Sequence, residues 1–269
     1  MPGVKENLAI WSTTWDWSTQ GDEWSQWWGG TRPMWYGALL PRIHSFVPTG
    51  TILEIAPGYG RWTQFLKDAC QRMIVVDLTE GCIEHCRERF ASSTNIEYHV
   101  NDGRSLDMVE DGSIDFVFSF DSLVHAEADV MEAYTRQLAR KLSPDGVGFI
   151  HHSNLASYRR LTQFAHKVPV SKLEALVRRG AVVNLPAWRA ESMSADLFRE
   201  QCASAGLRCV GQELINWEHG RYLIDCLSQF TRPGSRWDRQ GTPRVRNPGF
   251  VDAARRTKRL YTGPDGLAS

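Results

Sequence analysis

Apolar residues gather into short runs between residues 50 and 154, and polar residues or glycines follow each run. Five of these runs read TILEIA, RMIVVDL, IEYHV, SIDFVFSF and VGFIHHSN, and each predicts a strand, the first two of them buried. Residues 61–70, 80–90 and 130–146 lie between them and are predicted to be helical. Strands that alternate with helices favour an α/β fold, with a parallel sheet covered by helices on both faces.

The alternation breaks at residues 155–193 and then resumes. Residues 194–207 predict a helix that Ser194 caps and Gly206 ends. Residues 208–217 and 222–230 predict a terminal strand pair. Proline, glycine and arginine dominate residues 231–269, a C-terminal extension with a basic run that is typical of a solvated helix face or tail.

Seven of the eleven tryptophans lie between Trp11 and Trp35. Residues 1–49 therefore predict an aromatic cap that wraps the core. Aromatic faces also suit sugars and sulfonium or ammonium cations, so some of these rings are candidates to line a pocket. Both functions can hold at once.

Charge and cysteine content narrow the class of partner. The formal net charge is zero and the pI is about 7.1, so no global field attracts nucleic acid or an anionic membrane. The six cysteines form no CxxC pair and are expected to be reduced, mostly buried thiols. No signal peptide and no stretch of 18 apolar residues is visible, which predicts a cytoplasmic protein with a small-molecule partner. The sequence leaves homo-oligomerisation open.

Ligands of parallel α/β sheets bind beyond the carboxyl ends of the strands. The first strand here ends in a glycine turn, LEIAPGYGRWT, which lets a ligand touch the main chain. Neither a full dinucleotide fingerprint nor a P-loop is present, because Thr63 replaces the third glycine and no lysine follows. Glu54 would repel phosphate and would suit an ammonium group.

Acidic residues also follow the next strands. Asp77 could accept hydrogen bonds from two ribose hydroxyls, and Asp102 could accept one from an adenine amino group. A ribose, an adenine and a cationic amino acid together describe S-adenosylmethionine.

The segments LEIAPGYG, VVDL, NDG and FVFSFDSLVH resemble the successive motifs of class I S-adenosylmethionine-dependent methyltransferases. The resemblance implies a Rossmann-like domain over residues 50–230, with a mostly parallel seven-stranded sheet and a terminal antiparallel pair. Ala56 departs from the glycine more usual in the family. The implied cofactor-binding residues are Glu54, Ala56, Gly58, Gly60, Thr63, Asp77, Leu78, Asp102, Gly103 and Asp121.

Within this family the chain looks most like bacterial sugar O-methyltransferases, among them the 1-O-methyltransferase of mycobacterial methylmannose polysaccharide synthesis. The segments APGYGRWT, FSFDSLVH and GFIHHSN and the tryptophan-rich start carry this likeness. It implies a hydroxyl acceptor on a short mannoside. Because residues 155–193 interrupt the alternation of strands and helices, we expect them to form a lid or side wall for that acceptor.

Methyl transfer to a hydroxyl needs a base, and three histidines follow predicted strands. His125, His151 and His152 are the candidates. His151 and His152 should face opposite ways because they are adjacent in a strand. Of the three, we favour His152.

Two further possibilities remain open from the residues alone. Asp121 with Asn154 or a nearby histidine could hold Mg²⁺ and polarise a sugar diol. Methylation of another small metabolite, on nitrogen or oxygen, would use the same cofactor domain. An RNA methyltransferase is a weaker alternative, because residues 121–125 read DSLVH instead of an Asp/Asn-Pro-Pro motif.

Overall fold

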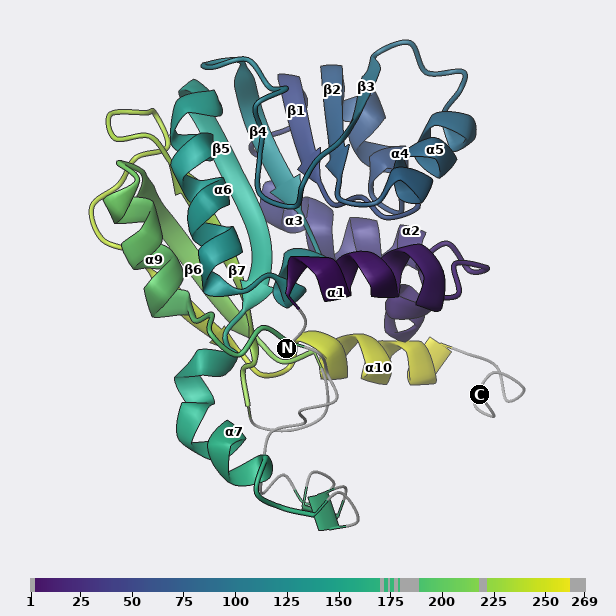
Figure 1. Ribbon diagram of the computed structural model, residues 1–269, viewed down its shortest axis with the longest axis vertical. Coiled ribbons are helices and arrows are strands. Elements are labelled where there is room, and N and C mark those ends of the chain that lie inside the picture. The colour runs from purple at the N-terminus through teal and green to yellow at the C-terminus, as the bar shows by residue number, and fades with distance from the viewer. Residues whose placement is uncertain are drawn as a thin grey trace.

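The computed structural model describes residues 3–169, 189–217 and 222–261, together with a few residues between 172 and 179. The described residues form one sheet with the strand order β3-β2-β1-β4-β5-β7-β6-β8 (Figure 1). Its strands are β1 (Thr49–Ile55), β2 (Cys70–Asp77), β3 (Ile96–Val100), β4 (Ile114–Ser119), β5 (Leu142–Ser153), β6 (Arg208–Ile215), β7 (Asp225–Thr231) and β8 (Arg244–Asn247).

The sheet is mostly parallel, as predicted. Strands β1 to β5 pair in parallel, and β7 pairs antiparallel with both β5 and β6. The expected count of seven strands is wrong, because β8 adds a parallel edge strand beside β6. The four residues of β8 are mostly exposed, so no alternation of apolar residues marks this strand in the sequence.

Helices cover both faces of the sheet. Helices α6 (Ala128–Lys141) and α9 (Ala195–Ser204) lie on the near face in Figure 1, and α2 (Thr31–Met34) and α3 (Leu40–Ile43) lie behind it. Side chains of β1 alternate between two buried clusters accordingly. Leu53 belongs to the cluster of α6 and α9, whereas Ile52 belongs to that of the N-terminal helices. The structure also contains α5 (Glu80–Arg89) and α10 (Phe250–Tyr261).

Two predicted helices are shorter than expected. The helix expected over residues 61–70 is one turn, α4 (Thr63–Leu66), followed by the 3₁₀ turn η4 (Lys67–Ala69), because β2 already begins at Cys70. The helix expected over 130–146 ends at Lys141, where β5 starts.

The N-terminal segment crosses the end of the sheet where the cofactor is expected. It forms α1 (Val4–Ala9), the π-helix η1 (Ile10–Thr14), the 3₁₀ helix η2 (Asp22–Trp28) and, beyond α2, the π-helix η3 (Trp35–Leu39). Figure 1 shows α1 lying across the carboxyl ends of the strands. Across the described residues, none of the helices has the length and apolar character needed to cross a membrane.

Candidate active site

The loop after β1 bends through three residues with left-handed backbone angles. Ala56, Gly58 and Gly60 have φ values of 58°, 57° and 80°. The N–H of Ala56 donates to the carbonyl of Val76 at 2.7 Å, which ties the loop to β2. Ala56 is therefore held in a conformation that costs an L-residue about 1 kcal/mol, which explains why glycine would be the easier residue there.

A cavity opens beside this loop at the carboxyl ends of the strands. It is lined by residues 56–59, by residues 77–79 after β2, by Gly103 after β3 and by residues 120–123 after β4. The predicted strand ends therefore meet around one space. We call this space the strand-end cavity.

Gly58 and Gly60 avoid different neighbours. A Cβ at Gly58 would lie 2.9 Å from the ring of Trp17, which covers the cavity side of the loop. A Cβ at Gly60 would lie 2.5 Å from the Phe90 ring inside the fold. Gly60 lies outside the cavity lining, so its lack of a side chain serves packing instead of ligand contact.

Asp77 is a buried carboxyl group in the cavity wall. Its Oδ2 accepts from the N–H of Gly58 at 3.2 Å, and its Oδ1 accepts from the N–H of Thr79 at 2.8 Å. Burial raises the pKa of Asp77 to about 6 against these two hydrogen bonds. Each oxygen keeps a lone pair for a ligand hydroxyl. Leu78 lines the cavity beside it.

Glu54 and Thr63 lie beneath the loop, outside the cavity lining. The Thr63 hydroxyl donates to Glu54 Oε2 at 2.5 Å, and the Glu54 side chain is buried. Burial raises the pKa of Glu54 to about 8, although the Thr63 hydrogen bond opposes the shift. The structure thus holds Glu54 as an internal support of the loop and does not bring it to the ligand space.

The two residues expected to bind the cofactor after β3, Asp102 and Gly103, have different surroundings. Asp102 Oδ1 accepts from the N–H groups of Arg104 and Ser105 at 2.8 Å and 2.6 Å. These bonds hold the pKa of Asp102 below its usual range. Asp102 lies outside the cavity lining, whereas Gly103 lines it directly beneath Val4 of α1.

Asp121 adopts φ 66° at the cavity edge after β4. Its carboxylate pairs with Arg61 at 2.8 Å, and both side chains are 6% exposed. Arg61 also donates to the Gly21 carbonyl and to Ser25 Oγ, so it joins the β4 loop to the N-terminal segment. Arg61 is a site residue that sequence reasoning missed, although it directly follows the glycine turn.

Aromatic rings of the N-terminal segment cover the strand-end cavity. Trp11, Trp17 and Trp24 line it. Trp17 stacks on Tyr59 with ring centroids 4.5 Å apart and planes 7° apart. Tyr59 in turn stacks on His85 of α5 at 3.9 Å. The predicted aromatic cap is therefore part of the cavity wall.

Only one of the three candidate histidines lines this cavity. His125 lies in the 3₁₀ turn η5 (Leu123–His125), and its ring lies 5.4 Å from that of Trp11. Asn7 of α1 donates to the His125 carbonyl at 3.4 Å. His125 therefore lies between the β4 loop and the N-terminal helix, at the cavity edge.

His151 and His152 are fully buried and face opposite sides of β5, as predicted. His152 stacks on Phe198 of α9, and its two ring nitrogens contact Ser153 O and Ser228 Oγ, each at 2.8 Å. Burial lowers the pKa of His152 to about 4. Our preference for His152 as the base is contradicted, because the ring lies in the core between the sheet and α9.

His151 lies beneath the cavity edge, packed against Phe120 and Trp217. Its Nδ1 accepts from the N–H of Asp121 at 3.2 Å, and its Nε2 lies 3.5 Å from Asp225 Oδ2. The side chain has no exposed surface and does not line the cavity. In this arrangement His151 cannot reach a substrate proton.

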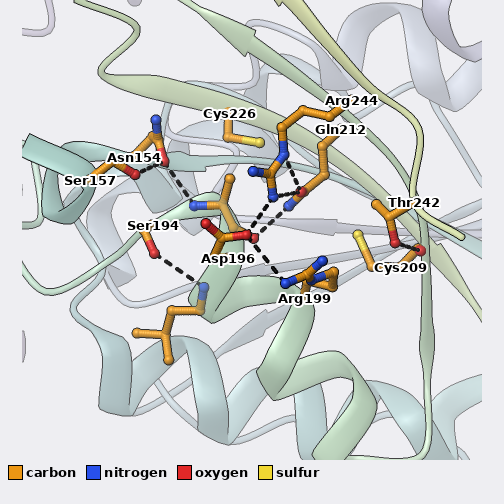
Figure 2. A network of polar contacts seen from close by, with 12 residues as sticks. Asn154, Ser157, Ser194, Asp196, Arg199, Cys209, Gln212, Cys226, Thr242 and Arg244 are labelled. Carbon is orange, nitrogen blue, oxygen red and sulfur yellow. Dashed lines mark hydrogen bonds and ion pairs between the residues drawn. The ribbon is translucent and has the colours of Figure 1, made fainter.

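The residues proposed for Mg²⁺ do not fit a metal. Asn154 Oδ1 accepts from the Ser157 hydroxyl (Figure 2). It also accepts from the N–H of Ala195, and Asn154 Nδ2 donates to the Leu223 carbonyl. These bonds occupy Asn154 at the start of α9, while Arg61 occupies Asp121. No cluster of three acidic, histidine or cysteine ligands occurs among the described residues. The magnesium prediction is therefore unsupported.

The predicted lid contributes nothing to the cavity lining within its described part. After η6 (Leu155–Tyr158), α7 (Arg159–Ala165) extends away from the strand ends in Figure 1. At the far end of the segment, the N–H of Ala190 donates to the Val124 carbonyl at 2.8 Å. Most of residues 170–188 lies outside the described residues, so the lid stays a prediction.

Part of the chain matches a known protein family. Residues 52–146, from β1 to the first half of β5, match the family model described as a methyltransferase domain. This segment contains the β1 loop, Asp77, Gly103 and the β4 loop. No curated protein sequence matches the chain.

Solved structures share the fold at low sequence identity. The PH0226 protein from Pyrococcus horikoshii OT3 is 19% identical with a TM-score of 0.53, covering 83% of this chain and 95% of that one. The DhpI-SAM-HEP complex is 20% identical with a TM-score of 0.54, covering 85% and 97%. The CcbJ methyltransferase from Streptomyces caelestis is 16% identical with a TM-score of 0.52, covering 81% and 99%.

Proposed function

We propose that this protein methylates a hydroxyl of a sugar or short mannoside in polysaccharide biosynthesis. Its methyltransferase domain and its Rossmann-like fold support an S-adenosylmethionine-dependent methyltransferase. The observation that carries the proposal is His125, which lines the same cavity as Asp77 and residues 56–59. A hydroxyl acceptor needs a base near the cofactor, and His125 is the candidate that lines the cavity proposed to hold it.

Two features of the cavity support S-adenosylmethionine as the cofactor. Asp77 offers a buried carboxyl group for the ribose diol, and the main chain of Gly58 and Gly103 lines the same cavity beneath Trp17 and Val4. When bound, the cofactor supplies an electrophilic methyl group on a sulfonium centre. The DhpI structure of the same fold was solved as a complex named for SAM, which supports this cofactor here.

In the proposed reaction, the chain aligns the acceptor and removes one proton. The His125 imidazole would accept the proton of the acceptor hydroxyl, so that its oxygen could bond to the methyl carbon as the carbon–sulfur bond breaks and S-adenosylhomocysteine leaves. The Trp11 ring beside His125 and the bond from Asn7 to its carbonyl hold this residue in place. No metal takes part in the proposal.

The aromatic cover favours a neutral acceptor. Trp11, Trp17 and Trp24 supply flat apolar faces on which a sugar ring can stack. The guanidinium of Arg61 already lies 5.2 Å above Trp24 and 4.6 Å above Trp62. A cationic acceptor would compete with Arg61 for these faces, which favours a sugar hydroxyl over an amine.

The experiment follows transfer of labelled methyl from S-adenosylmethionine to a panel of methyl mannosides and matched amino compounds. For the His125→Gln variant, we expect turnover to fall by about 100- to 10,000-fold with cofactor affinity retained. The control is His152→Asn. His152 is a candidate histidine that lies in the core and outside the cavity lining, so its replacement should leave turnover of the folded enzyme unchanged.

Two outcomes would contradict the proposal. Methylation of amines but not of mannosides would replace the substrate class, since amines need less help from a base. Loss of turnover in His152→Asn with full activity in His125→Gln would remove His125 as the base.

We propose a small glycan acceptor as the partner, and no nucleic acid or membrane, because a formal net charge of zero gives no overall attraction to either.

A further inference from the structure

The loop that carries His125 begins with a residue held in an unfavourable backbone conformation. Asp121 has φ 66°, a left-handed angle that an L-residue adopts only at some cost. Such a conformation persists when the surroundings fix it from several sides. The contacts of the β4 loop show which groups do so.

Three contacts hold the loop at its start and near its end. Asp121 Oδ2 accepts from Arg61 at 2.8 Å, and Ser122 Oγ donates to the Ala56 carbonyl at 2.7 Å. The Val124 carbonyl accepts from the N–H of Ala190. None of these three contacts involves the N–H of Asp121. That N–H donates to His151 Nδ1, so this hydrogen bond orients the peptide group at the turn.

The bond to His151 fixes the tautomer of this histidine. Because Nδ1 accepts a hydrogen bond, the neutral imidazole carries its proton on Nε2. This proton faces Asp225 Oδ2 at 3.5 Å. Asp225 accepts from Arg189 Nε at 2.8 Å and from its Nη2 at 3.1 Å.

The neighbours of Asp225 keep this buried carboxyl group ionised. Burial opposes the ionisation of Asp225, but Arg189 and His151 outweigh it and hold the pKa of Asp225 at about 2. Asp225 therefore stays a carboxylate, and its Oδ2 lies 3.5 Å from Nε2 of His151 without a hydrogen bond between them. A chain of buried groups thus runs from Arg189 through Asp225 and His151 to the backbone of Asp121.

We propose that His151 is a positioning residue whose Nδ1 fixes the turn at Asp121 and so sets the place of His125 in the strand-end cavity. Asp225 and Arg189 hold the imidazole in the Nε2–H form. For its kinetic readout this inference rests on the proposed methyl transfer, whereas its structural readouts do not need an acceptor.

The structural test is hydrogen exchange of the peptide that spans residues 121–125. His151→Leu removes the acceptor, and we expect exchange of this peptide to rise by about tenfold. His151→Asn places an amide oxygen near the position of Nδ1 and should restore protection. His152→Leu is the matched control, since it alters an equally buried neighbour on the opposite face and should leave this peptide unchanged.

The kinetic test separates positioning from proton transfer. In His151→Leu we expect kcat to fall by about 100-fold, while the Kd of S-adenosylhomocysteine changes by less than about twofold. His151→Asn should recover most of kcat. If the asparagine variant is as slow as the leucine variant, His151 moves a proton itself and the positioning proposal is overturned.

A measurement on the unmodified protein covers the case in which His151→Leu does not fold. ¹⁵N NMR of labelled histidines, assigned with His151→Asn, should show that His151 carries its proton on Nε2 and that Nδ1 is an acceptor. Protonation on Nδ1 would overturn the proposal. Unchanged exchange in His151→Leu, or an equal rise in His152→Leu, would do the same. If no mannoside accepts methyl, the proposed substrate class fails, and the exchange and NMR results still decide on His151.

Discussion

Two buried carboxyl groups lie on either side of the β1 loop, and burial raises the pKa of both. The pKa of Glu54 rises from 4.5 to about 8 and that of Asp77 from 3.8 to about 6. A raised pKa means that the folded state holds a proton that the unfolded state has released. This contribution to stability is complete below the ordinary pKa and is lost as pH rises through the folded value.

Glu54 should therefore make the free energy of unfolding fall at neutral to alkaline pH. Above pH 6.5 most of the contribution of Asp77 to stability is already lost, because its pKa is about 6. Between pH 6.5 and 8 we therefore expect Glu54 alone to lower the free energy of unfolding, by about 2 kcal/mol. Glu54→Gln, which stays neutral, should show a flatter dependence. Urea unfolding of both proteins across this range checks the prediction, and parallel curves would contradict it.

Gly60 offers a second test at the level of one residue. Gly60→Ala places a methyl group 2.5 Å from the Phe90 ring and keeps φ at 80°, so we expect a loss of about 3 kcal/mol. The matched control is Gly234→Ala, with φ 81° and no neighbour within 4 Å, which should lose about 1 kcal/mol. Equal losses in thermal unfolding would show that packing against Phe90 is unimportant.

At this scale the sequence predicted residue types better than directions. Asp77, Gly58, Gly103 and His125 line the cavity as expected, because each follows a strand or the first turn. Nothing in the sequence shows that Asp102 bonds its own turn or that His152 faces α9. Side-chain direction depends on the register of β5, which the adjacent histidines alone do not fix.

At the scale of elements, the N-terminal segment is part of the site. Trp17 packs over Gly58 and stacks on Tyr59, so its ring shields the loop that we propose to contact the cofactor. We expect Trp17→Ala to weaken binding of S-adenosylhomocysteine by about 3- to 10-fold, as an aromatic contact of this kind contributes about 1 kcal/mol. Titration calorimetry measures the change.

Trp237→Ala is the matched control. Trp237 packs edge-on against Phe46 and lies outside the cavity lining. Its loss should lower stability and leave the affinity unchanged. If both variants bind equally well, the N-terminal segment is a cap on the core alone.

The central strands β1, β2, β4 and β5 could be predicted because most of their residues are buried and apolar, whereas β3 is only partly buried. The edge strand β8 could not, since its exposed sequence RVRN has no apolar pattern. The predicted length of α4 was too great, because the sequence does not show that β2 begins as early as Cys70. The order of the elements followed from their alternation, whereas their lengths depend on tertiary contacts.

On the scale of the whole molecule, one cavity joins the loops after four neighbouring strands with the N-terminal segment. The central claim is that this cavity binds S-adenosylmethionine. A ligand at 100 times its Kd contributes about 2.7 kcal/mol to folding stability. For a domain of this size, that corresponds to a rise in Tm of roughly 5 to 10 °C.

Thermal unfolding with S-adenosylmethionine, its demethylated product and NAD tests this claim most directly. We predict that both sulfur compounds raise Tm, that NAD does not, and that Asp77→Ala removes most of the rise. Stabilisation by NAD with no response to S-adenosylmethionine would contradict the account.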